Sequence, residues 1–252
     1  MKKKQKDVTP RRHRKNRRLS DDSPFAIREA FNKLRMNILY TPNNGVGCPI
    51  YGITSAEMAV GKSTIAANLA ISLSQSGKKV LLIDGDMRCP SQHKIFDCEK
   101  DRPGLSELLA GIAHDDKAIM LKPNPNLFVL TSGCIPPNPS ELLMSKKFDD
   151  YIKRWKYEYD LIFIDFPPVG IVTDPITVIT HLSGFIFVAM VNRSDATRVK
   201  HAISAIEHVG GKSIVLVLNG SNRRGSAKSK YGPSKYSYKY DYCYGYSYEY
   251  SK

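Results

Sequence analysis

Tyr51-Gly-Ile-Thr-Ser-Ala-Glu-Met-Ala-Val-Gly-Lys-Ser-Thr64 is the stretch that decides the predicted fold of this 252-residue chain. The apolar run at residues 50–53 predicts a buried strand, and a loop of mostly small residues follows it. Ile65, Leu69 and Leu73 then recur at helical spacing, so a helix begins where the loop ends. Backbone N–H groups and the positive end of the helix dipole meet at such a junction, which therefore favours a bound phosphate.

The Gly-Lys-Ser-Thr end of the loop predicts contacts with a nucleotide. Lys62 would reach the outer phosphates, and the Ser63 hydroxyl would hold Mg²⁺. Ala56, Ala59 and Val60 stand where such loops often carry Gly, so the backbone has less freedom here. The alternative is an ordinary turn that contains Gly-Lys-Ser. The predicted nucleotide-binding residues of the loop are Ala59, Val60, Gly61, Lys62, Ser63 and Thr64.

Two later apolar runs end in acidic residues. Residues 79–84 predict a fully buried strand that delivers Asp84 and Asp86 at its carboxyl end, and residues 161–165 end in Asp165. A carboxylate after such a strand suits Mg²⁺ beside a terminal phosphate. Two acidic strand ends after Gly-Lys-Ser-Thr therefore predict a Mg-nucleotide site.

Further strands are predicted at residues 127–130, 185–191 and 214–218, with helical stretches between most of them. This alternation predicts an α/β fold with a mostly parallel central sheet flanked by helices. Ligands of such sheets bind beyond the carboxyl ends of the strands. We therefore expect Lys62, Asp84, Asp86 and Asp165 to converge.

The net charge of +14 is concentrated at the two ends of the chain. Residues 1–20 carry +9 and residues 222–252 carry +5, which leaves the middle neutral, so a nucleic-acid-binding fold is not expected. Residues 1–22 are predicted to be a disordered basic arm. The arm could be simply solvated, or attracted to anionic lipid or to nucleic acid.

A helix with one apolar face is predicted to begin after the arm, with Ser23 as N-cap and Pro24 as first residue.

Residues 222–252 differ in composition from the rest. Nine of the fourteen tyrosines fall in 231–250, and a Tyr occupies every second position from 236 to 250. No aliphatic residues accompany them, so we predict a mobile low-complexity tail rather than a strand. The tail could offer phosphate acceptors or could stack on nucleic acid.

Cysteine usage and hydropathy favour a cytoplasmic protein. The five cysteines form no Cys-x-x-Cys pair, which predicts neither a zinc site nor a disulfide framework. The basic start is followed by no apolar stretch typical of a signal peptide, and no run of about 18 apolar residues predicts a membrane span.

Together these motifs resemble the bacterial tyrosine kinases (BY-kinases) of capsule and exopolysaccharide synthesis, which are P-loop NTPases. The resemblance extends from Ser23 to Lys252 and includes the segment Glu29-Ala-Phe-Asn-Lys-Leu-Arg35. The other matching segments are Gly61-Lys-Ser-Thr-Ile-Ala-Ala-Asn-Leu-Ala70, Leu82-Ile-Asp-Gly-Asp-Met-Arg-Cys-Pro90, Leu130-Thr-Ser-Gly-Cys-Ile-Pro-Pro-Asn-Pro-Ser-Glu-Leu142, Ile164-Asp-Phe-Pro-Pro-Val169 and the tyrosine-rich end.

The resemblance implies roles for individual residues. Lys62 and Ser63 would bind ATP phosphates and Mg²⁺, Asp84 would take the proton from a tyrosine hydroxyl, and Asp86 with Asp165 would position Mg²⁺. Asn219, after the last strand, would contact adenine. Met58, Ala59 and Val60 replace a segment that is usually Pro-Gly-x, which is expected to crowd the loop and weaken ATP binding.

The resemblance also implies an assembly. A ring of subunits would present each tail to the site of a neighbour, and the acceptors would be Tyr236, Tyr238, Tyr240, Tyr242, Tyr244, Tyr246, Tyr248 and Tyr250. Glu29 and Arg35 match the ring-contact motif of the family, whereas Asn32 stands where Arg is usual. Members of this short type depend on a membrane-bound activator, which would hold this chain at the inner face of the cell membrane.

The predicted organisation is an arm at 1–22, a P-loop kinase domain at 23–221 and a tail at 222–252. The main rival is a ParA/MinD-like partitioning ATPase, which carries a Lys five positions before the main Lys. Here that position is Glu57, and the rival also lacks a tyrosine-rich tail. The other alternative is a scaffold that binds nucleotide without catalysis.

Overall fold

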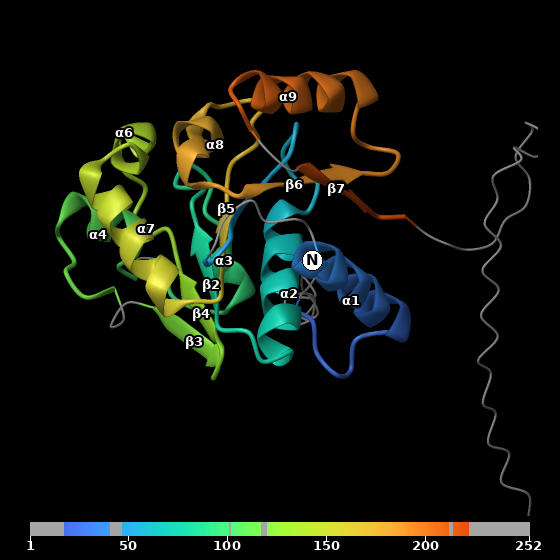
Figure 1. Cartoon of the computed structure of the whole chain (residues 1–252), viewed down its shortest axis with the longest axis horizontal. Helices are drawn as coiled ribbons and strands as arrows, with labels where there is room; N and C mark the ends of the chain where they lie inside the picture. Colours follow the sequence, from blue (N-terminus) through green and yellow to red (C-terminus); the bar gives the residue numbers. More distant parts are fainter. Residues whose placement is uncertain (1–17, 41–46, 101, 117–119, 212–213, 222–252) are drawn as a thin grey trace, which may run out of the picture. The chain divides into compact units, whose positions relative to one another are not determined.

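A single seven-stranded sheet organises the computed structural model, which describes residues 18–40, 47–100, 102–116, 120–211 and 214–221 (Figure 1). The spatial order of the strands is β3-β4-β2-β5-β1-β6-β7. All neighbouring pairs are parallel except β3 with β4. The predicted mostly parallel sheet is therefore confirmed. Its strands are β1 (Ile50–Thr54), β2 (Val80–Asp84), β3 (Leu121–Asn124), β4 (Leu127–Leu130), β5 (Leu161–Asp165), β6 (Gly184–Met190) and β7 (Ile214–Asn219).

The sequence analysis missed one strand, β3. It has four residues, includes Pro123 and has no fully buried residue, so it lacks the apolar run that marked the others. Pairing with β4 alone fixes it at the sheet edge, where a proline is tolerated.

Helices cover both faces of the sheet. On one face α1 packs against α2, and α2 contacts strands β1, β2, β4 and β5. On the other face the clusters around α4 and α7, and around α9, pack against the alternate strand residues. The helices are α1 (Phe25–Tyr40), α2 (Lys62–Gln75), α3 (Gln92–Ile95), α4 (Leu105–Ala110), α6 (Pro139–Leu143), α7 (Lys146–Glu158), α8 (Asp174–Thr177), a 3₁₀ turn (Ile179–His181) and α9 (Ala196–His208).

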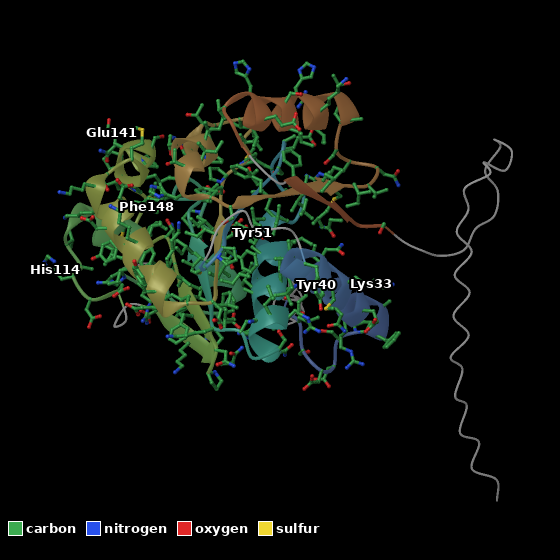
Figure 2. The ribbon with its side chains drawn as sticks, viewed as in Figure 1. Lys33, Tyr40, Tyr51, His114, Glu141 and Phe148 are labelled. Atoms are coloured by element: carbon green, nitrogen blue, oxygen red, sulfur yellow. The ribbon has the colours of Figure 1, made fainter. Side chains whose placement is uncertain are left out.

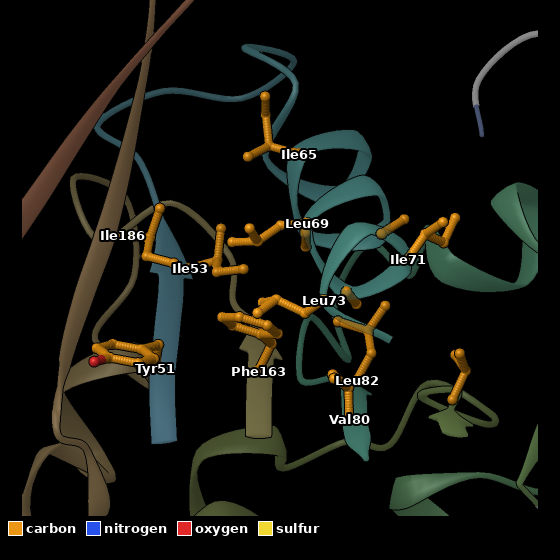
Figure 3. Packing of buried hydrophobic residues seen from close by; sticks show 14 of the residues in the cluster. Tyr51, Ile53, Ile65, Leu69, Ile71, Leu73, Val80, Leu82, Phe163 and Ile186 are labelled. Carbon is orange, nitrogen blue, oxygen red and sulfur yellow. The ribbon is translucent and has the colours of Figure 1, made fainter. Parts of the chain in front are cut away.

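The core between α2 and the sheet fixes where the phosphate loop can lie. Leu69 and Leu73 of α2 are fully buried against Ile53, Leu82 and Phe163 of three different strands (Figure 3). Alternate residues of each strand face this cluster, as expected for a sheet covered on both sides. The helix is therefore held rigidly with its N-terminus at the carboxyl edge of the strands.

Helix α1 differs from its prediction in two ways. Its first intrahelical bonds run from Ile27 and Arg28 to the Pro24 carbonyl, and the Ser23 hydroxyl accepts from Ser20 N instead of capping the helix. Several apolar side chains of α1 are also exposed, led by Tyr40 at 76% and Phe25 at 71%. Figure 2 labels Tyr40 on this helix. Only Ile38 of the predicted apolar face is fully buried, with Phe31 and Leu34 packing partly against the core.

Part of the predicted arm contacts the domain. Leu19 packs against the main core and its N–H donates to Asn68 Oδ1 at 2.7 Å, while Arg18 pairs with Asp97 at 3.4 Å. Residues 1–17 and the predicted tail at 222–252 lie outside the described residues. In the described part of the chain no helix has both the length and the hydropathy needed to cross a bilayer.

Candidate active site

The phosphate loop joins the end of β1 to the start of α2, as the sequence predicts. Gly61 precedes α2 with φ +96°, a left-handed conformation that favours glycine. A Cβ at Gly61 would also meet Asn219 Nδ2, so any side chain here would displace the Asn219 amide. Asn219 donates from Nδ2 to the Val60 carbonyl at 2.9 Å. The end of β7 therefore braces the loop just before Lys62.

The three replaced loop residues have different consequences. Met58 is 62% exposed, and Val60 is fully buried in the core beneath the loop. Ala59 has φ +58°, which costs a residue with a Cβ roughly 1–2 kcal/mol. The strain of this loop is therefore located at Ala59.

We expect Ala59→Gly to stabilise the protein by up to about 1 kcal/mol, because glycine occupies this backbone conformation without the steric cost. ATP affinity should increase, since the loop no longer has to be held in a strained shape. Thermal unfolding and nucleotide titration measure the two effects. Ala56→Gly is the matched control, because Ala56 has no positive φ and should show no such gain. A lower midpoint for Ala59→Gly would contradict the strain argument.

Three carboxylates gather at the carboxyl ends of two neighbouring strands. Asp84 of β2 lies directly opposite Asp165 of β5, and both are fully buried. Asp86 follows two residues later and is 6% exposed. Asp84 Oδ1 and Asp165 Oδ1 have no hydrogen-bond partner among the described residues. Buried acceptor oxygens without partners indicate a site that is completed by a ligand or ion.

Lys62 and Ser63 face these carboxylates from the start of α2. Burial raises the pKa of Asp165 to about 6, against the opposing effects of the Lys62 charge and the Ser63 hydroxyl hydrogen bond. Burial also raises the pKa of Asp86, opposed by the Cys89 backbone N–H and by Lys62. Burial and the charge of Asp165 together raise the pKa of Asp84 well above its usual value. The four predicted residues at the strand ends and the helix start thus converge.

These residues suit a Mg-nucleotide. Mg²⁺ in phosphoryl-transfer sites takes only one or two carboxylates, the rest of its ligands being water and phosphate oxygens. Asp165 and Asp86, with the Ser63 hydroxyl, supply that set. Within the described ranges no group of three or more His, Cys, Asp or Glu side chains is arranged as an all-protein metal cage. The donor set therefore fits a metal that arrives with phosphates.

Gln92 links the parts of the site, and the sequence analysis missed it. Its side-chain Nε2 donates to Asp165 Oδ2 at 2.9 Å and to the Ser63 carbonyl at 3.1 Å. Its backbone N–H and that of Ser91 both donate to Asp84 Oδ2, at 2.9 and 3.0 Å. A fully buried glutamine fixes α2, β2 and β5 relative to one another. Only its position eight residues after an acidic strand end could have suggested a role.

Arg88 clamps the loop that carries Asp86. Its Nε and Nη2 donate to Asp174 Oδ2 and Oδ1 at 2.8 and 3.0 Å, and the Ser140 hydroxyl donates to Asp174 Oδ1 at 2.6 Å. Burial opposes them, but these hydrogen bonds hold the pKa of the fully buried Asp174 below its usual value. The clamp ties the loop after β2 to α8 and α6.

We expect Arg88→Ala to destabilise the fold by up to about 3 kcal/mol, because it leaves the buried Asp174 carboxylate without its ion-pair partner. Asp86 should also lose its fixed position, so the affinity of the site for a Mg-nucleotide should fall. Urea unfolding and Mg-nucleotide titration measure the two effects. The double variant with Asp174→Asn should recover much of the lost stability. Equal destabilisation by the single and double variants would contradict an unpaired carboxylate as the cause.

A cleft of about 930 Å³ opens beside the first half of the phosphate loop. Met58 and Ala59 line one side, Val169 and Ile171 another, and α9 a third. Arg198 of α9 approaches Glu57 at 3.8 Å. The cleft gives a second molecule access to the loop from outside.

The remaining predicted residues lie away from this cluster. On α1, Glu29 accepts from Asn32 Nδ2 at 2.9 Å, and Arg35 donates to the Ser72 carbonyl of α2 at 3.1 Å. Both contacts are within the chain, so the predicted ring contact remains a prediction. The eight predicted acceptor tyrosines lie outside the described residues.

Comparison with known proteins gives consistent results. A family model described as ParA, the NUBPL iron-transfer P-loop NTPases, matches residues 49–231. The putative tyrosine-protein kinase CapB of Staphylococcus aureus is 38% identical over 200 residues, covering 79% of this chain and 86% of that protein. The tyrosine-protein kinase CpsD of Streptococcus agalactiae is 35% identical over 204 residues, covering 81% and 88%. The crystal structure of the chimerical protein CapA2B2 superposes with a TM-score of 0.70 at 38% identity, covering 77% and 85%.

Proposed function

Because this chain belongs to the ParA-like P-loop NTPases and, among them, to the bacterial tyrosine-protein kinases, we propose that it phosphorylates protein tyrosines at the expense of ATP. The observation that carries the proposal is the convergence of Lys62 with three buried carboxylates, two of which have an oxygen without a partner in the described part of the chain. Phosphoryl transfer needs charge neutralisation and positioning more than covalent chemistry from the protein. The site provides both.

Each residue then has one task. Lys62, the loop backbone from Ala59 to Thr64 and Asn219 bind the nucleotide, and Ser63, Asp86 and Asp165 hold Mg²⁺. Mg-ATP supplies the phosphoryl group. Asp84 takes the phenolic proton, which matters because a phenol with a pKa near about 10 is a poor nucleophile at neutral pH.

We further propose that the acceptors are the tail tyrosines at alternate positions from 236 to 250, modified between subunits of a homo-oligomeric ring to which Glu29 and Arg35 contribute. Each phosphate adds nearly two negative charges, so repeated transfer would reverse the charge of a basic tail and loosen the ring. A membrane-bound activator would hold the chain at the inner face of the membrane and complete the site. The biological role would be control of capsular or extracellular polysaccharide synthesis and export. Nucleic acid is not an expected partner.

The test is to incubate the full chain with a membrane partner's cytoplasmic segment and Mg-ATP, and to map phosphorylated sites by mass spectrometry. Phosphate on the alternate tail tyrosines supports the proposal. ATP binding without any phosphotyrosine would favour a scaffold. DNA-stimulated ATP hydrolysis without phosphotyrosine would favour a partitioning ATPase, although Glu57 occupies the position where that class carries its extra Lys.

A further inference from the structure

Five buried side-chain atoms have no hydrogen-bond partner among the described residues. They are Asp84 Oδ1, Gln92 Oε1, Thr131 Oγ1, Ser132 Oγ and Asp165 Oδ1. The atoms of Asp84, Asp165 and Gln92 belong to residues of the site described above, but that site gives the two hydroxyls no task. Thr131 and Ser132 are 3% and 1% exposed. A buried hydroxyl without a partner has lost its hydrogen bonds to water without replacement, so its presence in a native fold requires an explanation.

Strand register brings Thr131 to the catalytic carboxylates. Parallel strands β2 and β4 pair Ile83 with Leu130, so one further residue places Thr131 beside Asp84. Asp84 itself pairs with Asp165 of β5. Thr131, Asp84 and Asp165 therefore form one row across three neighbouring strands.

Side-chain alternation separates the two hydroxyls. Val129 of β4 and Leu82 of β2 both belong to the cluster beneath α2, whereas Leu130 and Ile83 belong to the cluster on the opposite face. Continuing the alternation places Thr131 on the α2 face with Asp84, and Ser132 on the other face. The segment is held there by α4, because Leu105 N donates to the Thr131 carbonyl at 2.8 Å. Thr131 is thus the hydroxyl on the side of the site, and Ser132 is a natural control.

The chemistry of the row calls for a hydroxyl donor. Asp84 Oδ2 accepts two backbone N–H groups, while Asp84 Oδ1 accepts none among the described residues. The Gln92 amide nitrogen is already engaged by Asp165 and by the Ser63 carbonyl, so it is not free for Oδ1. A hydroxyl can donate to an ionised carboxylate and can accept from a protonated one. Of the five atoms without partners, only the two hydroxyls can do both.

In the ligand-free structure neither Thr131 Oγ1 nor Asp84 Oδ1 has a hydrogen-bond partner among the described residues. We propose that Thr131 is a positioning residue for tyrosine phosphorylation: when nucleotide and acceptor occupy the site, its hydroxyl donates to Asp84 Oδ1 and orients that carboxylate toward the acceptor phenol. Once Asp84 carries the phenolic proton, the same hydroxyl accepts from it. The inference rests on the proposed kinase function and on Asp84 as the base. It also gives a function to the Leu130-Thr-Ser-Gly133 segment, whose residues the formation of strand β4 alone does not explain.

The experiment compares Thr131→Val, Thr131→Ser and Ser132→Ala in the full chain, with the activator segment and Mg-ATP present. Thr131→Val keeps the shape and removes the hydroxyl, so kcat should fall about 10- to 100-fold, as for a lost hydrogen bond to a charged group. The KM for ATP should stay unchanged, and the thermal midpoint should not fall, because the removed hydroxyl has no hydrogen-bond partner within the described ranges of the unliganded protein. Thr131→Ser should restore most of kcat, and Ser132→Ala should match the unmodified protein.

Two results would overturn the proposal while leaving the kinase function intact. One is an unchanged kcat in Thr131→Val when the unmodified protein is active. The other is an equal loss of kcat in Ser132→Ala or in Thr131→Ser, which would mark a packing effect. An unmodified protein that binds ATP but forms no phosphotyrosine would instead refute the proposed function, and this inference with it.

Discussion

Lys62→Ala is expected to lower tyrosine phosphorylation by about 10²–10³-fold, because it removes a preorganised positive charge from the position where phosphate charge develops. Lys62 is 7% exposed. Burial raises the pKa of Asp86 and of Asp165 and the Lys62 charge opposes that shift, so the exchange also removes a compensating cation from both carboxylates. Phosphosite quantification in the presence of the activator segment gives the rate. ATP binding should weaken in parallel.

The matched control for Lys62→Ala is Lys153→Ala. Lys153 is exposed on α7, on the opposite face of the sheet from α2, so its loss should change neither the rate nor ATP binding. Lys62→Met is the second variant, since it keeps the buried aliphatic stem and separates charge from packing. A Lys62→Met protein with full activity would show that the phosphate loop does not act through this cation.

Asp84→Asn is expected to have two opposite effects, a loss of activity and a gain in stability of the ligand-free protein. Activity should fall about 10²–10⁴-fold, since asparagine cannot accept the phenolic proton. The fold should tolerate the change, because an amide oxygen can still accept the Ser91 and Gln92 N–H groups. The amide nitrogen would then stand at the carboxylate oxygen that has no partner among the described residues.

The gain in stability follows from the raised pKa values of the buried carboxylates. A carboxyl group whose pKa is higher in the folded state binds its proton more tightly there, so the free energy of unfolding falls as pH rises past the unfolded value. For Asp165, a pKa of about 6 corresponds to a cost of about 3 kcal/mol at neutral pH. The pKa of Asp84 is shifted in the same direction by burial and by Asp165.

Urea unfolding between pH 4 and pH 8, with EDTA and without nucleotide, measures this dependence. The unmodified protein should lose stability as pH rises through the raised pKa values, from about 4 to above 6. Asp84→Asn and Asp165→Asn should each flatten the curve and be more stable at pH 7.5. Asp160→Asn, at an exposed position beside β5, is the control. A lower free energy of unfolding for Asp84→Asn than for the unmodified protein at pH 7.5 would contradict this account, in which the buried carboxylates destabilise the ligand-free protein and Mg-ATP removes that destabilisation.

The parts of the site carried by single segments could be predicted from the sequence. An apolar run that ends in Asp84 or Asp165 fixes the strand and the place of the carboxylate together, because the carboxyl end of a buried strand is a local feature. The Gly61-Lys62-Ser63 junction likewise needs only a strand, a turn and a helix start. The sequence therefore predicted Lys62 and Asp84 as site residues. The alternation of strands and helices predicted the parallel sheet that joins them.

Other features depend on segments that are distant in the sequence. Gln92 and the Arg88–Asp174 pair carry no local signature, because a hydrogen bond across the fold leaves no periodicity in either partner's neighbourhood. The sequence predicted a crowded phosphate loop, which corresponds to the backbone strain at Ala59. It did not predict that Val60 lies in the core beneath the loop, because only the packing of the folded chain places it there. The short edge strand β3 exists because β4 offers it hydrogen bonds, not because its residues favour extension.

The sequence by itself determined the order of elements, the phosphate loop and the identities of the acidic strand ends, since each depends on neighbours within a few residues. Tertiary structure decided which polar groups meet at the carboxyl edge of the sheet, which of them are left without partners, and that Thr131 falls in the same row as Asp84 and Asp165. The physical reason is that burial and hydrogen-bond satisfaction are properties of the packed chain, and they set the energies on which this chemistry depends.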